Sequence, residues 1–245
     1  MNRFYYDLHI HSCLSPCGDE DSTPNNIAGM AALSELDIVA LTDHNSCKNC
    51  PAFFAAAEGY GITPIAGMEL TTAEDIHVVC LFETLSDALG FDSYVELNRM
   101  HIRNRPEFFG EQLILDEKDN LKGTVPDLLT SATYFPIDET KDVVSRFNGI
   151  CYPAHIDRES NGIIAILGSI PPDSPFSFYE MHDGEKRDEY SRRYGIPKEN
   201  IIISSDAHNL PDIRDKENYF VLDAERGDHE TVRKRLFELL RGGNK

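Results

Sequence analysis

Short apolar segments alternate with longer amphipathic segments in the N-terminal part of the chain. The short segments are rich in β-branched and aromatic residues, as is typical of strands, and the longer ones have helical periodicity. The pattern predicts strands at Phe4–Ile10, Asp37–Leu41, Thr63–Ala66 and Ile76–Phe82, and helices at Thr23–Leu36 and Pro51–Tyr60. Such an alternation of strands and helices favours parallel pairing around a sheet or barrel.

This rhythm is interrupted between about residues 86 and 148. A predicted helix at Ser86–Arg103 leads into a stretch rich in turn residues, and a second helix follows at Asp138–Phe147. Strands then resume at Gly149–Pro153, Phe178–Met181, Ile201–Ser204 and Tyr219–Leu222, before a final helix from about Asp228 to Arg241. We therefore expect one domain over residues 1–245, with an inserted cap segment at about 86–148.

The charge of the chain bears on its partners. It carries 42 acidic and 23 basic side chains, a formal net charge of −19. Because such a surface repels polyanions, we expect duplex nucleic acid to be an unlikely partner. A small phosphorylated substrate remains compatible with this charge if bound metal ions supply the local attraction.

Targeting signals are not apparent in the sequence. No basic and apolar leader precedes the first predicted strand, and no segment approaches the roughly 18 apolar residues of a membrane span. We therefore expect a cytoplasmic protein without a membrane partner. In a long chain without an export signal, the six cysteines are expected to be reduced thiols. Cys47 and Cys50 form an isolated Cys-x-x-Cys pair without a thioredoxin-like context, which favours a structural role.

Histidines stand at alternate positions at the end of the first predicted strand. Alternation directs His9 and His11 to the same face, so that both can reach one metal ion. Imidazole suits zinc, iron or manganese. Two buried structural histidines would produce the same pattern, so this pair alone leaves both interpretations open.

Further candidate ligands stand at or just beyond the ends of other predicted strands: His44, Glu69, His77, His155, Asp206 and His208. Each of these signals is weak alone, because a single histidine or acid in such a position is more often structural. Together they place nitrogen and oxygen ligands at successive strand ends, where α/β folds gather their ligands. Coincidence is then the weaker explanation.

The ordered set of these motifs resembles the PHP superfamily, named for polymerase and histidinol phosphatase. The resemblance extends from Asp7 to His208 and rests on Asp-Leu-His-Ile-His-Ser, Thr-Asp-His-Asn, Gly-Met-Glu-Leu, His77, Pro-Ala-His and Ser-Asp-Ala-His. It implies a single-domain distorted (β/α)7 barrel. It also implies phosphoester hydrolysis at a centre of two or three divalent metal ions of zinc, manganese or iron.

Residue by residue, the resemblance implies roles for these side chains. His9 and His11 would bind a first ion together with Asp206, and Glu69 would bridge this ion to a second one. Glu69 and Asp206 would therefore be catalytic.

The remaining histidines would complete the second and third ion sites. His77 and His155 would hold the second ion, and His44 and His208 the third. Family members often have a further histidine or acid after the first motif, where this chain departs from the pattern and offers Cys17. A metal would lower the pKa of this thiol. Asp19 is the alternative ligand.

An arginine follows the Pro-Ala-His motif. In similar enzymes an arginine near this position contacts the substrate phosphate, and its fork of donors matches phosphate oxygens. We therefore expect Arg158 to be a catalytic, phosphate-binding residue, with a surface ion pair to Asp157 or Glu159 as the alternative. His101, His182 and His229 match no motif, and of these His182 is placed to contact substrate.

The predicted function is metal-dependent hydrolysis of a phosphomonoester or a small phosphodiester by a metal-activated water. A nucleotide, a short oligonucleotide or a sugar phosphate would fit such a site. Histidinol phosphate is one alternative substrate. A non-catalytic metal-binding module and a hydrolase of C–N bonds are the other interpretations, although the closing Asp206–His208 pair and the bridging Glu69 favour the phosphoesterase.

Overall fold

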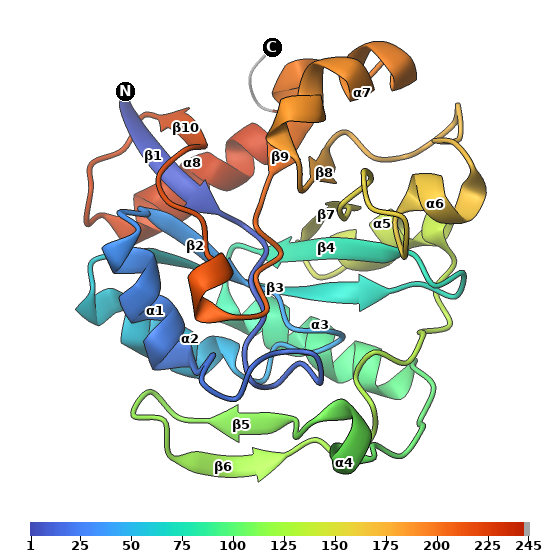
Figure 1. Ribbon diagram of the computed structural model, residues 1–245. Coiled ribbons are helices and arrows are strands. Elements are labelled where there is room, and N and C mark those ends of the chain that lie inside the picture. Colours follow the sequence, from blue (N-terminus) through green and yellow to red (C-terminus); the bar gives the residue numbers. More distant parts are fainter. Residues whose placement is uncertain (243–245) are drawn as a thin grey trace.

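Six strands form one curled sheet in the order β10-β1-β2-β3-β4-β7 (Figure 1). In this computed structural model, which describes residues 1–242, the strands are β1 (Asn2–Asp7), β2 (Ile38–Leu41), β3 (Thr63–Thr71), β4 (His77–Phe82), β7 (Ile150–Pro153) and β10 (Tyr219–Leu222). Strands β1, β2 and β3 are parallel, as the sequence predicts. The remaining pairs, β10 with β1, β3 with β4 and β4 with β7, are antiparallel.

The antiparallel β4 departs from the expected parallel barrel. Only residues 72–76 connect β3 to β4, and a parallel crossover needs about a dozen residues or more. The connection is therefore a turn, and β4 returns alongside β3. The expectation of an α/β fold is confirmed, but the pairing is that of a mixed, curled sheet and not of a regular (β/α)7 barrel.

Two further strands, β8 (Tyr179–Met181) and β9 (Ile201–Ile203), form a separate parallel pair. This pair meets the large sheet at one end. Ile10 forms an isolated bridge with Ala207, and the Ile156 amide donates to the Glu180 carbonyl oxygen at 2.8 Å. The loops that follow β1, β7 and β9 are thereby brought together.

Most helices contribute to the cluster on the outer strand faces, whereas α8 (His229–Leu240) contributes to the inner one. The helices of the outer cluster are α1 (Pro24–Leu33), α2 (Cys50–Gly59), α3 (Leu85–Leu97), α5 (Ile137–Ser145), α6 (Ile163–Leu167) and α7 (Arg187–Tyr194). Helix α1 begins where the sequence predicts, because Thr23 accepts a hydrogen bond from the Asn26 amide and Pro24 occupies the first turn. The α8 helix begins in the same way at Asp228, which caps the Thr231 amide.

Successive side chains of a strand point to opposite faces, so the hydrophobic core consists of two clusters. Residues of β1 and β2 such as Phe4, Leu8 and Ile38 share an inner cluster with Leu236 and Phe237 of α8. Side chains on the opposite strand faces pack with α1, α2 and α3 in a larger outer cluster. The polar site described below lies at the edge where the inner cluster ends.

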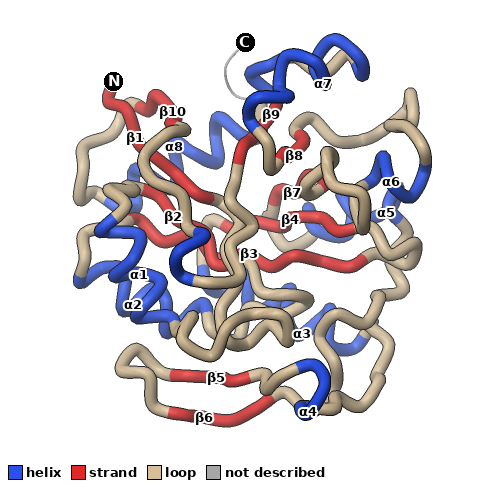
Figure 2. Tube along the Cα trace, viewed as in Figure 1, coloured by secondary structure: helices blue, strands red, loops and turns tan. Residues whose placement is uncertain are grey.

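The inserted segment between α3 and α5 is mostly loop (Figure 2). It contains α4 (Pro106–Phe109) and the hairpin of β5 (Leu113–Leu115) with β6 (Leu121–Thr124). The helix predicted to continue to Arg103 ends at Leu97, because Arg99 and Arg103 pair instead with Thr133 and Asp127 in extended bridges. The segment packs against the loop after β1, where the Leu113 amide donates to the Cys13 carbonyl at 3.0 Å.

Candidate metal centre

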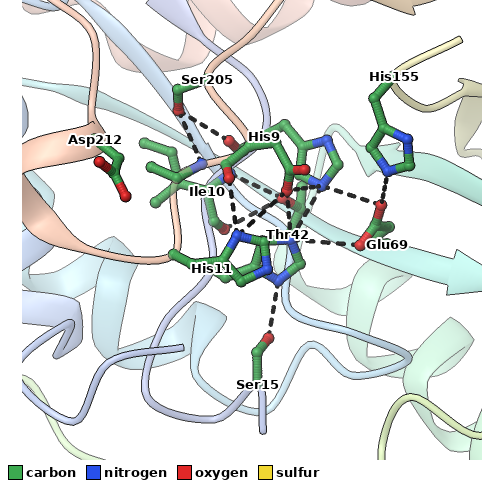
Figure 3. Close-up of polar contacts among 12 residues, drawn as sticks. His9, Ile10, His11, Ser15, Thr42, Glu69, His155, Ser205 and Asp212 are labelled. Atoms are coloured by element: carbon green, nitrogen blue, oxygen red, sulfur yellow. Dashed lines mark hydrogen bonds and ion pairs between the residues drawn. The ribbon is translucent and has the colours of Figure 1, made fainter. Parts of the chain in front are cut away.

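Histidines and carboxylates in or next to six strands converge at one edge of the sheet, as Figure 3 shows for His9, His11, Glu69 and His155. His9 and His11 follow β1, and His44 follows β2. Glu69 lies within β3 and His77 begins β4, while His155 follows β7 and Asp206 and His208 follow β9. Strand β1 itself ends at Asp7 and not at Ile10 as predicted, but its two histidines still point to the same place.

The most buried group consists of His9, His11, Glu69 and Asp206, whose ligand atoms lie within 4.8 Å of one another. The Nε2 atoms of His9 and His11 are 3.1 Å apart, and they lie 3.3 and 3.1 Å from Asp206 Oδ1. Both imidazoles also lie 3.4 Å from a Glu69 oxygen. All four side chains are at most 3% exposed.

Glu69 is also approached by three further histidines. Its Oε1 lies 2.9 Å from both His77 Nδ1 and His155 Nε2, and its Oε2 lies 3.0 Å from His44 Nδ1. One carboxylate thus lies between two sets of imidazoles. This is the arrangement of a ligand that bridges two cations.

A third possible metal-binding group consists of His11, His44 and His208. The ring centroid of His11 lies 4.6 Å from that of His44 and 4.2 Å from that of His208. The structure does not bring Cys17 or Asp19 into any of the three groups formed by residues 1–242. Cys17 is exposed, and Asp19 accepts a hydrogen bond from the Asp21 amide.

Burial and mutual attraction shift the pKa values of these groups strongly. Burial alone would lower the pKa of His11, but Asp206 and Glu69 outweigh it and raise the pKa to about 9. Burial likewise opposes ionisation of Glu69, whose pKa is nevertheless held well below its usual value by His77, His9 and other histidines. Burial lowers the pKa of His44 to about 3. The centre therefore combines ionised carboxylates, a protonated histidine and a neutral one.

The residues fit divalent metal ions. His44 Nδ1, His77 Nδ1 and Asp206 Oδ1 are buried without a hydrogen-bond partner among the described residues, although charged atoms lie close to them. Unpartnered buried polar atoms are costly unless another group satisfies them. Imidazole and carboxylate donors suit zinc, manganese and iron. A cation would also replace the protons that balance Glu69 and Asp206.

Outer contacts hold the first two histidines in place. His9 Nδ1 lies 2.8 Å from Glu180 Oε1, and His11 Nδ1 lies 2.9 Å from Ser15 Oγ, which donates to Asp43 Oδ1 at 2.7 Å. No motif in the sequence assigns a role to Glu180, Ser15 or Asp43. Glu180 could have been found from its position near the end of β8, two residues before His182.

Arg158 extends from the loop after β7 towards the same cluster. Its Nη1 lies 2.7 Å from Asp206 Oδ2, and its side chain is 38% exposed. It does not pair with Asp157, which accepts hydrogen bonds from the His182 and Asp183 amides. His182 is held beside it by a 2.9 Å contact between its Nδ1 and the Ser205 carbonyl.

The backbone is unusual at the site. Asn45, His155 and Asp206 have φ values of 46°, 28° and 52°, a left-handed region that costs non-glycine residues energy. Such conformations persist where surrounding contacts determine them. Their concentration around the ligand cluster indicates a site whose geometry is imposed by the fold.

Comparison with known protein families shows to which family this chain belongs. The sequence profile of the PHP domain matches residues 7–158. The chain belongs to the PHP domain family. The clustered histidines and carboxylates that the motifs single out are residues of the kinds that could hold metal ions.

A curated relative is an error-prone DNA polymerase of Symbiobacterium thermophilum, 35% identical over 96 residues. The alignment covers 39% of this chain and 8% of the polymerase. The chain therefore spans only a small part of that relative.

Solved structures share the fold at low sequence identity. Endonuclease Q of Pyrococcus furiosus has a TM-score of 0.67 at 17% identity, covering 99% of this chain and 57% of the endonuclease. An amidohydrolase of Chromobacterium violaceum has a TM-score of 0.58 at 17% identity, covering 87% of this chain and 91% of that one.

In the part of the chain that the structure describes, no helix is long and apolar enough to cross a membrane.

One expectation from the sequence is contradicted. Net acidity suggested that duplex nucleic acid is an unlikely partner. A structure of endonuclease Q with a TM-score of 0.66 to this chain is a complex with a 27-mer duplex substrate that carries an abasic lesion at the active site. Net charge failed as a guide because the local field of a metal centre, and not the average over the surface, acts on a bound phosphate.

Proposed function

We propose that this protein hydrolyses phosphoester bonds of nucleotides or nucleic-acid strands at a centre of two or three divalent metal ions. The observation that carries the proposal is the environment of Glu69, whose two oxygens are contacted by histidines from separate strands. Metal ions bound there would polarise a phosphoryl group and lower the pKa of a coordinated water.

The distances support the proposed ligand roles. His9, His11 and Asp206 would hold one ion, and Glu69 would bridge it to a second ion. The second ion would be completed by His77 and His155, which lie on the other side of Glu69.

The third ion would be held by His44 and His208, beside His11. Cys17 and Asp19, the two candidates for its remaining ligand, belong to the loop after β1, and either would have to move closer to join the group. Although Cys17 is exposed as a residue, loss of water around its sulfur, followed by the charge of Glu69, raises the pKa of the thiol to about 12. Only direct binding to a cation would then deprotonate it at neutral pH.

Arg158 would bind the phosphate of the substrate. Its guanidinium already pairs with Asp206, and its partial exposure leaves donors free to face an entering anion. In this role it orients the phosphoryl group and offsets negative charge that develops on its oxygens. A surface ion pair would not place the guanidinium on a buried carboxylate of the cluster.

Support for a nucleic-acid substrate comes from the inserted segment. Phe108 and Phe109 of α4 are 69% and 42% exposed, and Arg105 lies 4.6 Å above the Phe108 ring. The next residue, Gly110, packs so closely on the loop after β1 that an added Cβ would lie 3.1 Å from the Pro16 carbonyl oxygen. Exposed aromatic rings beside arginines are suited to stacking nucleobases.

A small phosphomonoester, such as a sugar phosphate or histidinol phosphate, is the second candidate substrate. It would need only the metal centre and the guanidinium of Arg158, whose side chain is 38% exposed beside the centre.

The test is phosphoester hydrolysis with a panel of substrates in added manganese or zinc. The panel contains single-stranded and duplex oligonucleotides with and without an abasic site, nucleotides, sugar phosphates, histidinol phosphate and an amide control. Cleavage of a phosphoester that requires both the metal and Asp206 supports the proposal. Metal-loaded protein that cleaves only the amide, or nothing, contradicts it.

A further inference from the structure

A buried carboxylate outside the predicted ligand set lies directly behind the centre. Glu180 belongs to β8, in the two-stranded sheet that is separate from the large one, and it is 1% exposed. Its Oε1 lies 2.8 Å from His9 Nδ1 and accepts a hydrogen bond from the His155 amide at 3.2 Å. One oxygen atom therefore contacts two residues of the proposed centre that come from different strands.

The contact with His9 determines how its imidazole is oriented. A carboxylate accepts hydrogen bonds, so the proton of the neutral ring lies on Nδ1 and the lone pair lies on Nε2. That Nε2 is the atom that faces His11, Glu69 and Asp206. Glu180 thus selects the tautomer in which His9 can bind a cation.

The hydrogen bond from the His155 amide to Glu180 stabilises a strained backbone conformation at His155. The φ value of His155 is 28°, and its amide would be buried without a partner if the Glu180 carboxylate were absent. The adjoining Ile156 amide donates to the Glu180 carbonyl oxygen at 2.8 Å. Side chain and main chain of one residue therefore hold the loop that presents His155 to Glu69.

Stability does not account for this carboxylate. Its second oxygen, Oε2, is buried without a hydrogen-bond partner among residues 1–242. A half-satisfied buried charge is costly to folding. Its position is therefore better explained by what it does to the two histidines than by a contribution to the core.

We propose that Glu180 is a positioning residue of the metal centre, which orients His9 and His155 and thereby increases the affinity of the site for divalent cations. This inference rests on the metal centre of the proposed function. Carboxylates that orient ligand histidines typically contribute a factor of about 10 to 100 in metal affinity.

The test is a Co²⁺ titration of the metal-free protein, followed by visible absorption and by competition with a chelating dye. Glu180→Gln keeps the volume of the side chain and an oxygen that can take the position of Oε1, but it removes the negative charge that polarises the His9 imidazole. We expect affinity for Co²⁺ to fall roughly tenfold to a hundredfold and the ligand-field bands to shift. The metal-free variant should unfold at a temperature no lower than that of the metal-free wild type, because a half-satisfied buried charge is removed.

Glu185→Gln is the matched control, because Glu185 is exposed on the turn that follows β8, and it should leave the titration unchanged. Wild-type affinity and spectrum in Glu180→Gln would overturn the inference while leaving the proposed function intact. Failure of the wild-type protein to bind Co²⁺ would overturn both. The Co²⁺ titration needs no substrate, so it can still be interpreted if the protein binds metal but does not hydrolyse phosphoesters.

Discussion

The metal centre and the inserted segment at residues 98–136 differ in how many contacts hold their side chains. At the centre the ligand side chains are almost entirely buried, and each is contacted by several others; Glu69 alone lies within 3.4 Å of five histidines. The inserted segment is mostly loop and exposes large apolar side chains such as Ile102, Phe108 and Leu121. One region is determined by many contacts, and the other is determined by few.

Under the proposed function, this difference assigns catalysis to the centre and selection of the substrate to the inserted segment. Chemistry at phosphorus requires charges held in fixed positions, which only the rigid edge of the sheet provides. Selection of the substrate requires exposed groups that can meet a partner. Changes at the centre should therefore abolish activity, and changes in the inserted segment should alter which substrate is used.

The largest effect is expected from Asp206→Asn. This change keeps the shape of the side chain but removes a charge that faces both His9 and His11. Because loss of an outer contact to a ligand costs up to about 100-fold, loss of a ligand should lower kcat/KM by more than about 100-fold. Steady-state hydrolysis measures this, with Asp212→Asn on the neighbouring loop as the control. Activity near that of the control would contradict the site assignment.

Removal of metal should have the next largest effect, and on stability as well as activity. Ions at about a thousand times their dissociation constant stabilise the folded state by about 4 kcal/mol. For a chain of this size this corresponds to roughly 8–16 °C in Tm. Thermal unfolding with and without a chelator measures the shift. The shift should persist when Phe108 is replaced by Ala, and an equal Tm in both conditions would show that the ions do not bind.

Arg158→Ala should weaken catalysis without dismantling the centre. Loss of charged hydrogen bonds costs about 1.5–3 kcal/mol, which corresponds to roughly tenfold to a hundredfold in kcat/KM. Co²⁺ affinity should change far less than activity, because Arg158 supplies no ligand atom. Arg192→Ala on the exposed face of α7 is the control. Equal kcat/KM in the Arg158→Ala and Arg192→Ala variants would contradict phosphate binding by Arg158.

The smallest effect is expected from the inserted segment. Phe108→Ala and Phe109→Ala should each raise KM for an oligonucleotide by roughly fivefold, because stacking of a base on an aromatic ring contributes about 1 kcal/mol or more. Values for a sugar phosphate should not change. Leu121→Ala, which alters an exposed apolar residue of the same segment, serves as the control. Equal changes in KM for the oligonucleotide and the sugar phosphate would contradict a role of the inserted segment in nucleic-acid recognition.

The amino-acid sequence by itself identified the histidines and carboxylates that gather at the centre and most of the elements that carry them, but it also offered Cys17, which lies in none of the groups of residues 1–242. Strand β2 and the start of helix α1 lie where periodicity and capping place them, because those signals depend on neighbours in the chain. The spacing of His9 and His11 and the family motifs were sufficient to name the residues that meet at the centre.

Only the tertiary structure decided how these parts are joined. The reversal of β4, the end of α3 at Leu97 and the position of Glu180 behind His9 depend on contacts between segments far apart in the chain. Local periodicity carries no information on such pairings, because the side chains that form them have no sequence spacing in common. Average charge misled for a similar reason, because it carries no information on where charged and aromatic side chains lie in the fold.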